Sequence, residues 1–127
     1  MRRTDQRRDA VFALYQHELT GRPLDDLLVD AKPFTRELAR ATNAHRPELD
    51  KAIARHAEGW TVDRIAPLER NIMRVALYEA AHSDDVPTEV ALDEAVSLAR
   101  EYSSADAPAF VNGVLGAAVR AEAGEKT

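Results

Sequence analysis

The apolar positions of this chain recur at helical spacing, most clearly over residues 110–119. There the large apolar residues come at positions i, i+1, i+4 and i+5, which is typical of a helix with one broad buried face. Strands flanking a turn would alternate with period two, so the pair Asn112 and Gly113 is interpreted as helix interior rather than as a hairpin. Glycine inside a helix costs about 1 kcal/mol relative to alanine. Because Gly113 and Gly116 lack side chains, we predict that other helices approach closely here, that this helix is the central one, and that Asp106 is its N-cap.

Further helical patterns precede it, each bounded by proline, glycine or a capping residue. The first is capped by Thr4 or Asp5 and ends at Gly21. No segment shows the sustained alternation of a strand, and the connections are short, so the sequence predicts an all-α fold: a compact bundle of about six to seven helices. The expected helices cover residues 4–20, 24–30, a segment opening at Pro33, one opening at Pro47 with Trp60 on its apolar side, 67–81, 88–101 and the helix after Asp106.

Composition supports a single globular domain over residues 1–127. Apolar residues make up 45% of the chain and charged residues 31%. No apolar run reaches the length of a membrane span, and the first residues contain no hydrophobic signal segment. We therefore expect a cytoplasmic protein without a membrane partner. Residues 122–127 are polar and small, and are expected to form a flexible tail.

The charge is unevenly distributed. The net charge is −5, yet residues 1–8 carry four arginines against one aspartate, a local charge of +3, which leaves −8 for the remainder. A basic arm on an acidic body predicts an anion-binding site, with phosphate of nucleic acid as the preferred anion. The alternative is a solvated terminus whose arginines have no ligand. The four arginines are Arg2, Arg3, Arg7 and Arg8.

The sequence offers no assembled catalytic chemistry. It has no cysteine, which excludes thiolate catalysis and zinc sites built on cysteine. Glu89 and Asp93 share one helix face, but carboxylates near a helix N-terminus are typical of a solvated acidic face. No serine lies in a nucleophile elbow. We therefore expect no enzyme activity, no metal and no cofactor. The chain has four histidines, and no two of them have the i, i+4 spacing of metal ligands on a helix: His17, His45, His56 and His82.

Several segments, taken in order along nearly the whole chain, resemble the NusB family of bacterial transcription antitermination factors. The strongest two are VPTEVALDEAVSLAR at residues 86–100 and FVNGVL at residues 110–115. Each segment alone is weak evidence for the resemblance, whereas the full set in the family's order is specific. A NusB-like domain also occurs fused to RNA methyltransferases, but 127 residues leave no room for that second domain. The remaining matching segments are residues 8–16, 34–38, 49–50 and 69–79.

The resemblance implies an all-α fold of two packed sub-bundles. It also implies binding to the boxA element of ribosomal RNA leader transcripts, together with NusE, a small-subunit ribosomal protein, within an antitermination complex on RNA polymerase. Some family members form homodimers, and the sequence leaves that state open. A second hypothesis is a helical adaptor that binds proteins and does not recognise RNA directly, because an acidic body suits a basic partner.

Carried over by position, the resemblance implies two sets of site residues. Arginines would contact phosphate, and an aromatic ring would stack on an unpaired base. For Tyr15, a core aromatic with its hydroxyl at the surface is the alternative. Glu69 and Arg74 would lie near the protein partner. The RNA-binding set is Arg2, Arg3, Arg7, Arg8, Tyr15, His56, Asp106 and Phe110.

Overall fold

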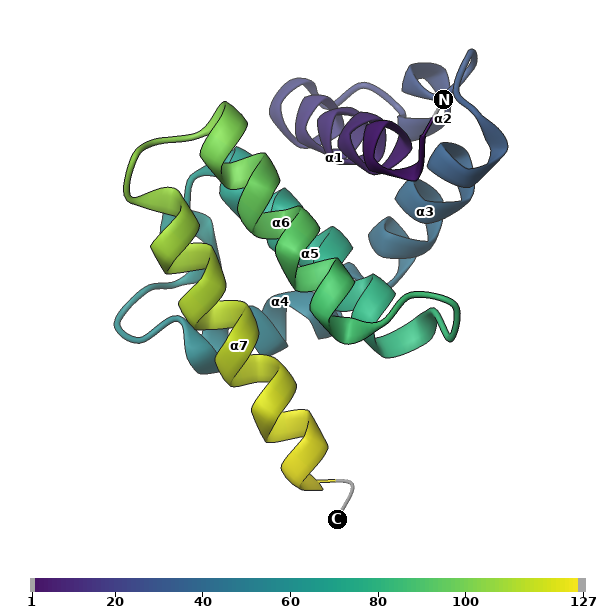
Figure 1. Cartoon of the computed structure of the whole chain (residues 1–127). Coiled ribbons are helices and arrows are strands. Elements are labelled where there is room, and N and C mark those ends of the chain that lie inside the picture. The colour runs from purple at the N-terminus through teal and green to yellow at the C-terminus, as the bar shows by residue number, and fades with distance from the viewer. Residues whose placement is uncertain (1, 126–127) are drawn as a thin grey trace.

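The computed structural model describes residues 2–125 of the chain, with side chains described to residue 121. Within that range the chain forms seven α-helices and one short 3-10 helix, and no strand, which confirms the predicted all-α class (Figure 1). The elements are α1 (Arg3–Thr20), α2 (Leu24–Leu27), α3 (Pro33–Ala44), α4 (Arg46–His56), η1 (Val62–Arg64), α5 (Pro67–His82), α6 (Thr88–Tyr102) and α7 (Ala107–Glu125).

The helices begin and end largely where the sequence signals place them. Pro33 and Pro67 are the first residues of α3 and α5, a position where the missing N–H costs no helical hydrogen bond. Gly21 ends α1 in the left-handed conformation, with φ of 75°, and its N–H donates to the carbonyl of His17. The carbonyl of Asp106 accepts from the N–H of Phe110 at 3.2 Å, as expected of an N-cap residue.

Two sub-bundles meet along α5. Helix α1 packs against both α2 and α3, while α7 packs against both α4 and α6, and these three helices also pack against α5. Helices α1 and α3 also contact α5, so α5 touches every other long helix (Figure 1). It is buried almost all round, over residues 71–77 and again at Glu79. The central helix is therefore α5, and the prediction that residues 110–119 form it was wrong.

The reason for this error is visible in both helices. α5 places the polar residues Asn71, Arg74 and Glu79 in the interior, so its sequence understates its burial. On α7, a Cβ added at Gly113 would meet no atom within 4 Å, and one at Gly116 would meet only the side chain of Arg120. No other helix therefore lies close against either glycine. α7 packs through its apolar face alone, and Val111, Val114, Leu115 and Ala118 are buried as predicted.

Other boundaries also differ from prediction, and α2 ends at Leu27 rather than at residue 30. α1 starts at Arg3 without a side-chain cap, because Thr4 donates its hydroxyl to Glu94 on α6 at 2.8 Å instead. Trp60 lies beyond the end of α4 and is 52% exposed, so it is not part of that helix's apolar face. α7 continues to Glu125, so residues 122–125 are helical rather than a tail, and residues 126–127 lie outside the described part.

Candidate nucleic-acid interface

The first two arginines of the basic arm face solvent. The side chain of Arg2 is 84% exposed and lies 3.7 Å from a carboxylate oxygen of Asp5, one turn along α1. The guanidinium carbon of Arg3 lies 3.9 Å from the centre of the Phe34 ring, which orients it by a cation–π contact. Long exposed ion pairs contribute little to stability. Both guanidinium groups are therefore available to an anion such as phosphate.

Arg7, in contrast, belongs to the interior. Its Nε lies 2.8 Å and 3.0 Å from the two carboxylate oxygens of Glu79, and both residues are buried. Glu94 lies 3.9 Å from its Nη1. The predicted role of Arg7 as a phosphate ligand therefore conflicts with its burial, because a phosphate would have to displace Glu79. The sequence contained a signal for this: Arg7 lies one helical turn before Ala10 and Val11, on the buried face of α1.

Arg8 is partly buried and already surrounded by carboxylates. It lies 3.3 Å from Asp5 and 3.2 Å from Asp9. Burial lowers the pKa of Arg8, but hydrogen bonding to Asp9 and Tyr102 outweighs it, so the pKa is raised and the charge is secure. Arg8 remains charged, but a phosphate would compete with its own carboxylates. Of the four arginines in the arm, only Arg2 and Arg3 are exposed.

The aromatic and polar residues expected at the RNA surface are distributed over several elements. Tyr15 on α1 and His56 at the end of α4 are half-buried, and within the described residues neither makes a ring contact. Asp106 is exposed directly before α7. The Phe110 ring packs against Trp60 at 6.3 Å between centroids and 70° between planes. Of the predicted RNA-binding residues, Phe110 therefore contacts Trp60, which the sequence had predicted to lie on the apolar side of a helix.

The two residues expected at the partner surface have different environments. Glu69 is half-buried, and its Oε1 accepts a hydrogen bond from the Ser103 hydroxyl at 2.9 Å. Glu69 also lines a surface cleft with Trp60 and Phe110. Arg74 is only 3% exposed, so its predicted contact with a protein partner conflicts with its burial.

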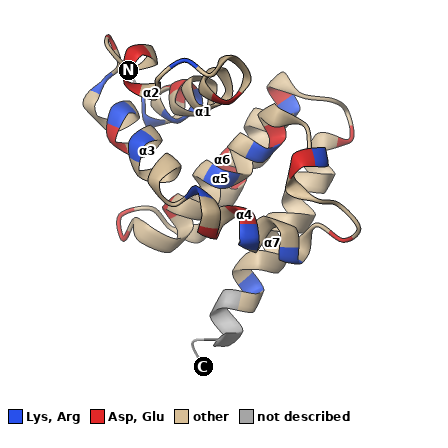
Figure 2. Ribbon diagram, turned by 180° about the vertical axis from the view of Figure 1, so that it is seen from behind, with Lys and Arg blue, Asp and Glu red and all other residues tan. Residues whose placement is uncertain are grey.

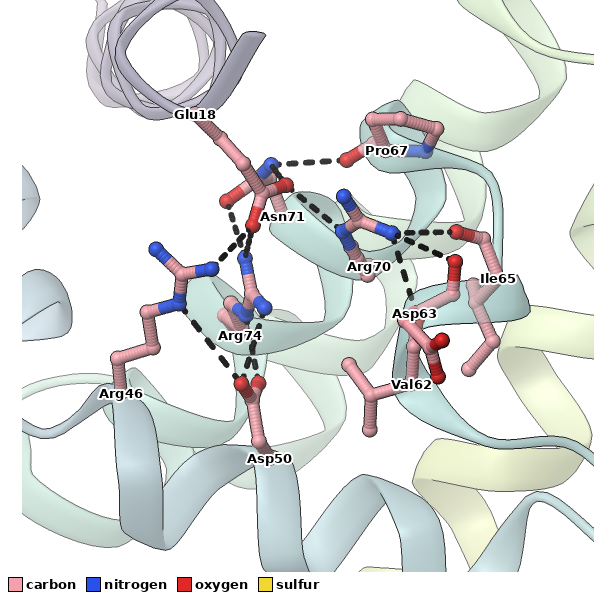
Figure 3. A network of polar contacts seen from close by, with 10 residues as sticks. All are labelled: Glu18, Arg46, Asp50, Val62, Asp63, Ile65, Pro67, Arg70, Asn71 and Arg74. Carbon is pink, nitrogen blue, oxygen red and sulfur yellow. Dashed lines mark hydrogen bonds and ion pairs between the residues drawn. The ribbon is translucent and has the colours of Figure 1, made fainter. Parts of the chain in front are cut away.

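Arg74 is part of a polar network that connects three helices (Figure 3). It donates from Nε and Nη2 to the two oxygens of Asp50 at 2.6 Å and 3.0 Å, and from Nη1 to Glu18 at 2.9 Å. The same Glu18 carboxylate also accepts from Arg46, Arg70 and Asn71. The network thereby joins the end of α1 to α4 and α5. Its arginines, although numerous, are used for cohesion between the sub-bundles.

The network also sets the protonation of Glu18. Burial raises the pKa of this carboxyl, but hydrogen bonds and charge from Arg74 and Arg70 outweigh burial, so the pKa of Glu18 is lowered. The same contacts raise the pKa of Arg74 against its own burial, through Asp50 and Glu18. The pair therefore stays ionised, and the network is held by full charges.

Arg70 extends the network to the segment before α5. Its Nη1 donates to the carbonyl oxygens of Val62, Asp63 and Ile65, at 3.4 Å, 3.3 Å and 3.0 Å. These bonds hold the η1 segment against α5, next to Trp60.

Basic and acidic residues are intermixed over the ribbon of both sub-bundles (Figure 2). Among the described residues no cluster of three histidine, aspartate or glutamate side chains is arranged to hold a metal ion. None of the described helices combines the length and hydropathy that a membrane crossing requires.

Comparison with known proteins identifies the family. The model of the NusB family matches residues 4–120. The chain belongs to the NusB family. This confirms the resemblance drawn from the ordered segments, and the match begins at Thr4, inside the basic arm.

Two relatives in this family are similar over much of the chain. One is the transcription antitermination protein NusB of Symbiobacterium thermophilum, 48% identical over 96 residues, which span 76% of this chain and 63% of that protein. The other is the transcription antitermination protein NusB of Rubrobacter xylanophilus, 41% identical over 122 residues, which span 91% of this chain and 88% of that protein.

Solved NusB structures have the same fold. T. maritima NusB superposes with a TM-score of 0.86 at 28% identity, covering 94% of this chain and 92% of that chain. A crystal structure of the antitermination factors NusB and NusE in complex with double-stranded RNA includes a chain that matches with a TM-score of 0.84 at 27% identity, covering 94% of this chain and 96% of that chain. The two-sub-bundle arrangement around α5 is therefore a NusB fold.

Proposed function

We propose that this protein is a transcription antitermination factor that binds the boxA element of ribosomal RNA leader transcripts together with NusE. The observation that carries the proposal is membership of the NusB family over residues 4–120. The similar NusB chain that was crystallised with NusE and double-stranded RNA supports both partners. In this proposal the protein acts without catalysis or cofactor, in the cytoplasm, as part of an antitermination complex on RNA polymerase.

The exposed arginines supply the electrostatic part of this function. Arg2 and Arg3 lie at the start of α1, where the helix dipole also favours a negative ligand. Phosphate contacts of this kind position an RNA but do not read its sequence. Sequence preference then comes from bases held by aromatic rings and by hydrogen bonds, for which Phe110, Asp106 and Tyr15 remain the predicted residues.

The test is a gel shift that compares a boxA RNA with a scrambled RNA of the same composition, with and without NusE. We expect the pair of proteins to shift single-stranded boxA RNA at lower concentration than the scrambled RNA. Equal shifts of boxA and scrambled RNA, with NusE still captured by the protein, would favour the adaptor hypothesis over RNA recognition. Failure to bind either RNA or NusE would reject the proposal as a whole.

Size-exclusion chromatography of the free protein at the same concentrations reports whether it is a homodimer.

A further inference from the structure

A small cleft opens between the segment after α4 and the beginning of α7. It encloses about 240 Å³. Pockets for drug-sized ligands enclose about 300–1,000 Å³, so this cleft suits one planar ring system rather than a whole nucleotide. Four of the residues that line it are apolar, and the other two are charged. The lining residues are Trp60, Arg64, Ile65, Ala66, Glu69 and Phe110.

Trp60 is presented at this cleft by a fixed backbone. Gly59 turns the chain with φ of 78°, and the N–H of Trp60 donates to the carbonyl of Ala57 at 2.8 Å. The near-perpendicular contact with Phe110 sets the plane of the indole. The bonds from Arg70 to the η1 segment hold the adjoining wall. An indole that is half exposed and yet held in one orientation is suited to stacking.

The charges around the cleft match the chemistry of a nucleotide. Arg64 is exposed and makes no ion pair within 4.0 Å among the described residues; its charge acts on Asp63 from a longer distance, so its guanidinium can contact a phosphate. Glu69 uses Oε1 for the Ser103 hydroxyl, and its Oε2 has no hydrogen-bond partner in the described part of the chain. That oxygen lies at the edge of the cleft, where it can accept a hydrogen bond from the exocyclic amino group of a base. Ring, cation and acceptor thus lie within one small site.

We propose that the Trp60 cleft is a subsite for one unpaired base of the bound RNA, which stacks on Trp60 while Arg64 contacts the adjacent phosphate. The proposal rests on the RNA-binding function proposed above and adds a position and two residues to it. Glu69 then favours a base with an exocyclic amino group, namely adenine, cytosine or guanine, over uracil. A protein side chain from NusE is the competing occupant, and the experiment below separates the two.

Trp60 is the only tryptophan of the chain, so its emission reports directly on the cleft. The experiment titrates the protein with fluorescently labelled boxA RNA, with and without NusE, and records RNA anisotropy and tryptophan emission in parallel. The Trp60→Phe variant serves as the blank, because any tryptophan signal that remains comes from NusE. We expect emission to be quenched in step with the rise in anisotropy, since stacking on a base places the indole in direct contact with it.

Substitutions extend the test. Base stacking of this kind corresponds to a weakening of about 5- to 100-fold when the ring is removed, so Trp60→Ala should weaken RNA binding within that range and Trp60→Phe much less. Arg64→Ala should flatten the salt dependence of the affinity by about 0.7 in log–log slope. The matched control is Arg40→Ala, an exposed arginine on α3 paired with Asp25. Thermal unfolding by circular dichroism verifies that each variant is folded.

Each outcome decides the matter. Quenching by RNA, with loss of affinity in Trp60→Ala, supports the subsite. A rise in anisotropy with unchanged emission and unchanged affinity of Trp60→Ala overturns the subsite and leaves the proposed function intact. A change in emission on adding NusE alone assigns the cleft to the protein partner and also overturns it. Absence of any RNA binding by the unmodified protein rejects the proposed function, and the subsite with it.

Discussion

Two groups of arginines in this protein have the same charge and opposite environments. At the start of α1, Arg2 and Arg3 are exposed, with one long ion pair and one ring contact to hold them. In the interior, Arg7 and Arg74 are fully engaged by the carboxylates of Glu79, Glu18 and Asp50. The comparison teaches that the number of arginines in a basic segment does not measure its capacity for RNA. What counts is how many of their donors remain unpaired after folding.

The largest effect should come from the interior network. Arg74→Ala removes the most buried cation of the network: Glu18, only 9% exposed, loses one of its three arginines, and the partly buried Asp50 keeps only a 3.8 Å contact with Arg46. Breaking a buried pair in this way costs about 3–5 kcal/mol, so the free energy of unfolding in urea should fall by that amount. The control is Arg46→Ala, which contacts the same Glu18 but has a side chain that is 39% exposed. Its loss should stay below about 1 kcal/mol; equal losses would contradict the distinction between the two groups.

Arg7 tests the distinction within the arm itself. Arg7→Ala leaves Glu79, which is only 1% exposed, without its cation, and should lower the free energy of unfolding by about 3 kcal/mol. Arg3→Ala, four residues earlier on the same helix, should cost less than about 1 kcal/mol. Replacing both members of the pair, as Arg7→Met with Glu79→Leu, should recover most of the loss in urea unfolding. If Arg3→Ala proves as destabilising as Arg7→Ala, the assignment of Arg7 to the interior fails.

The exposed pair should control RNA binding instead. Arg2→Ala combined with Arg3→Ala removes two exposed cations, so the slope of log affinity against log salt should become shallower by about 1.4 for single-stranded RNA. Affinity for boxA at low salt should fall about tenfold, while the free energy of unfolding changes little. Fluorescence anisotropy in the presence of NusE, at four or five salt concentrations, gives the slope. An unchanged slope would mean that the start of α1 does not contact phosphate.

The smallest expected effect concerns pH. The pKa of Glu18 is lower in the folded protein than in the unfolded chain, so its ionised form stabilises the fold at neutral pH. That contribution is fully present above the unfolded value of about 4.3 and is lost as the pH falls through the folded value. Urea unfolding of the wild type should therefore show a steeper loss of stability below about pH 4.3 than Glu18→Gln does. Parallel pH profiles of the two proteins would show that Glu18 is not coupled to the arginines.

Much of the fold follows from local sequence signals. Pro33, Pro67 and Gly21 bound their helices because proline and glycine restrict or permit backbone angles regardless of what lies nearby. The buried face of α7 likewise follows from its period of apolar residues. Family membership was also recognisable, because the ordered segments are a property of the chain and not of its packing.

The sequence by itself thus determined the helices, several of their boundaries and the family, while the tertiary structure decided which side chains are free. Arg7 and Glu79 are 72 residues apart, and Arg74 and Glu18 are 56 apart, so no local pattern announces that they pair. Trp60 has an apolar side chain, but α4 ends before reaching it, and its contact with Phe110 of α7 leaves about half of it exposed. Exposure depends on contacts between distant segments, whereas the signals that begin and end a helix lie in residues that are neighbours in the chain. That difference is the physical reason why the helices were predictable and the availability of the arginines and of Trp60 was not.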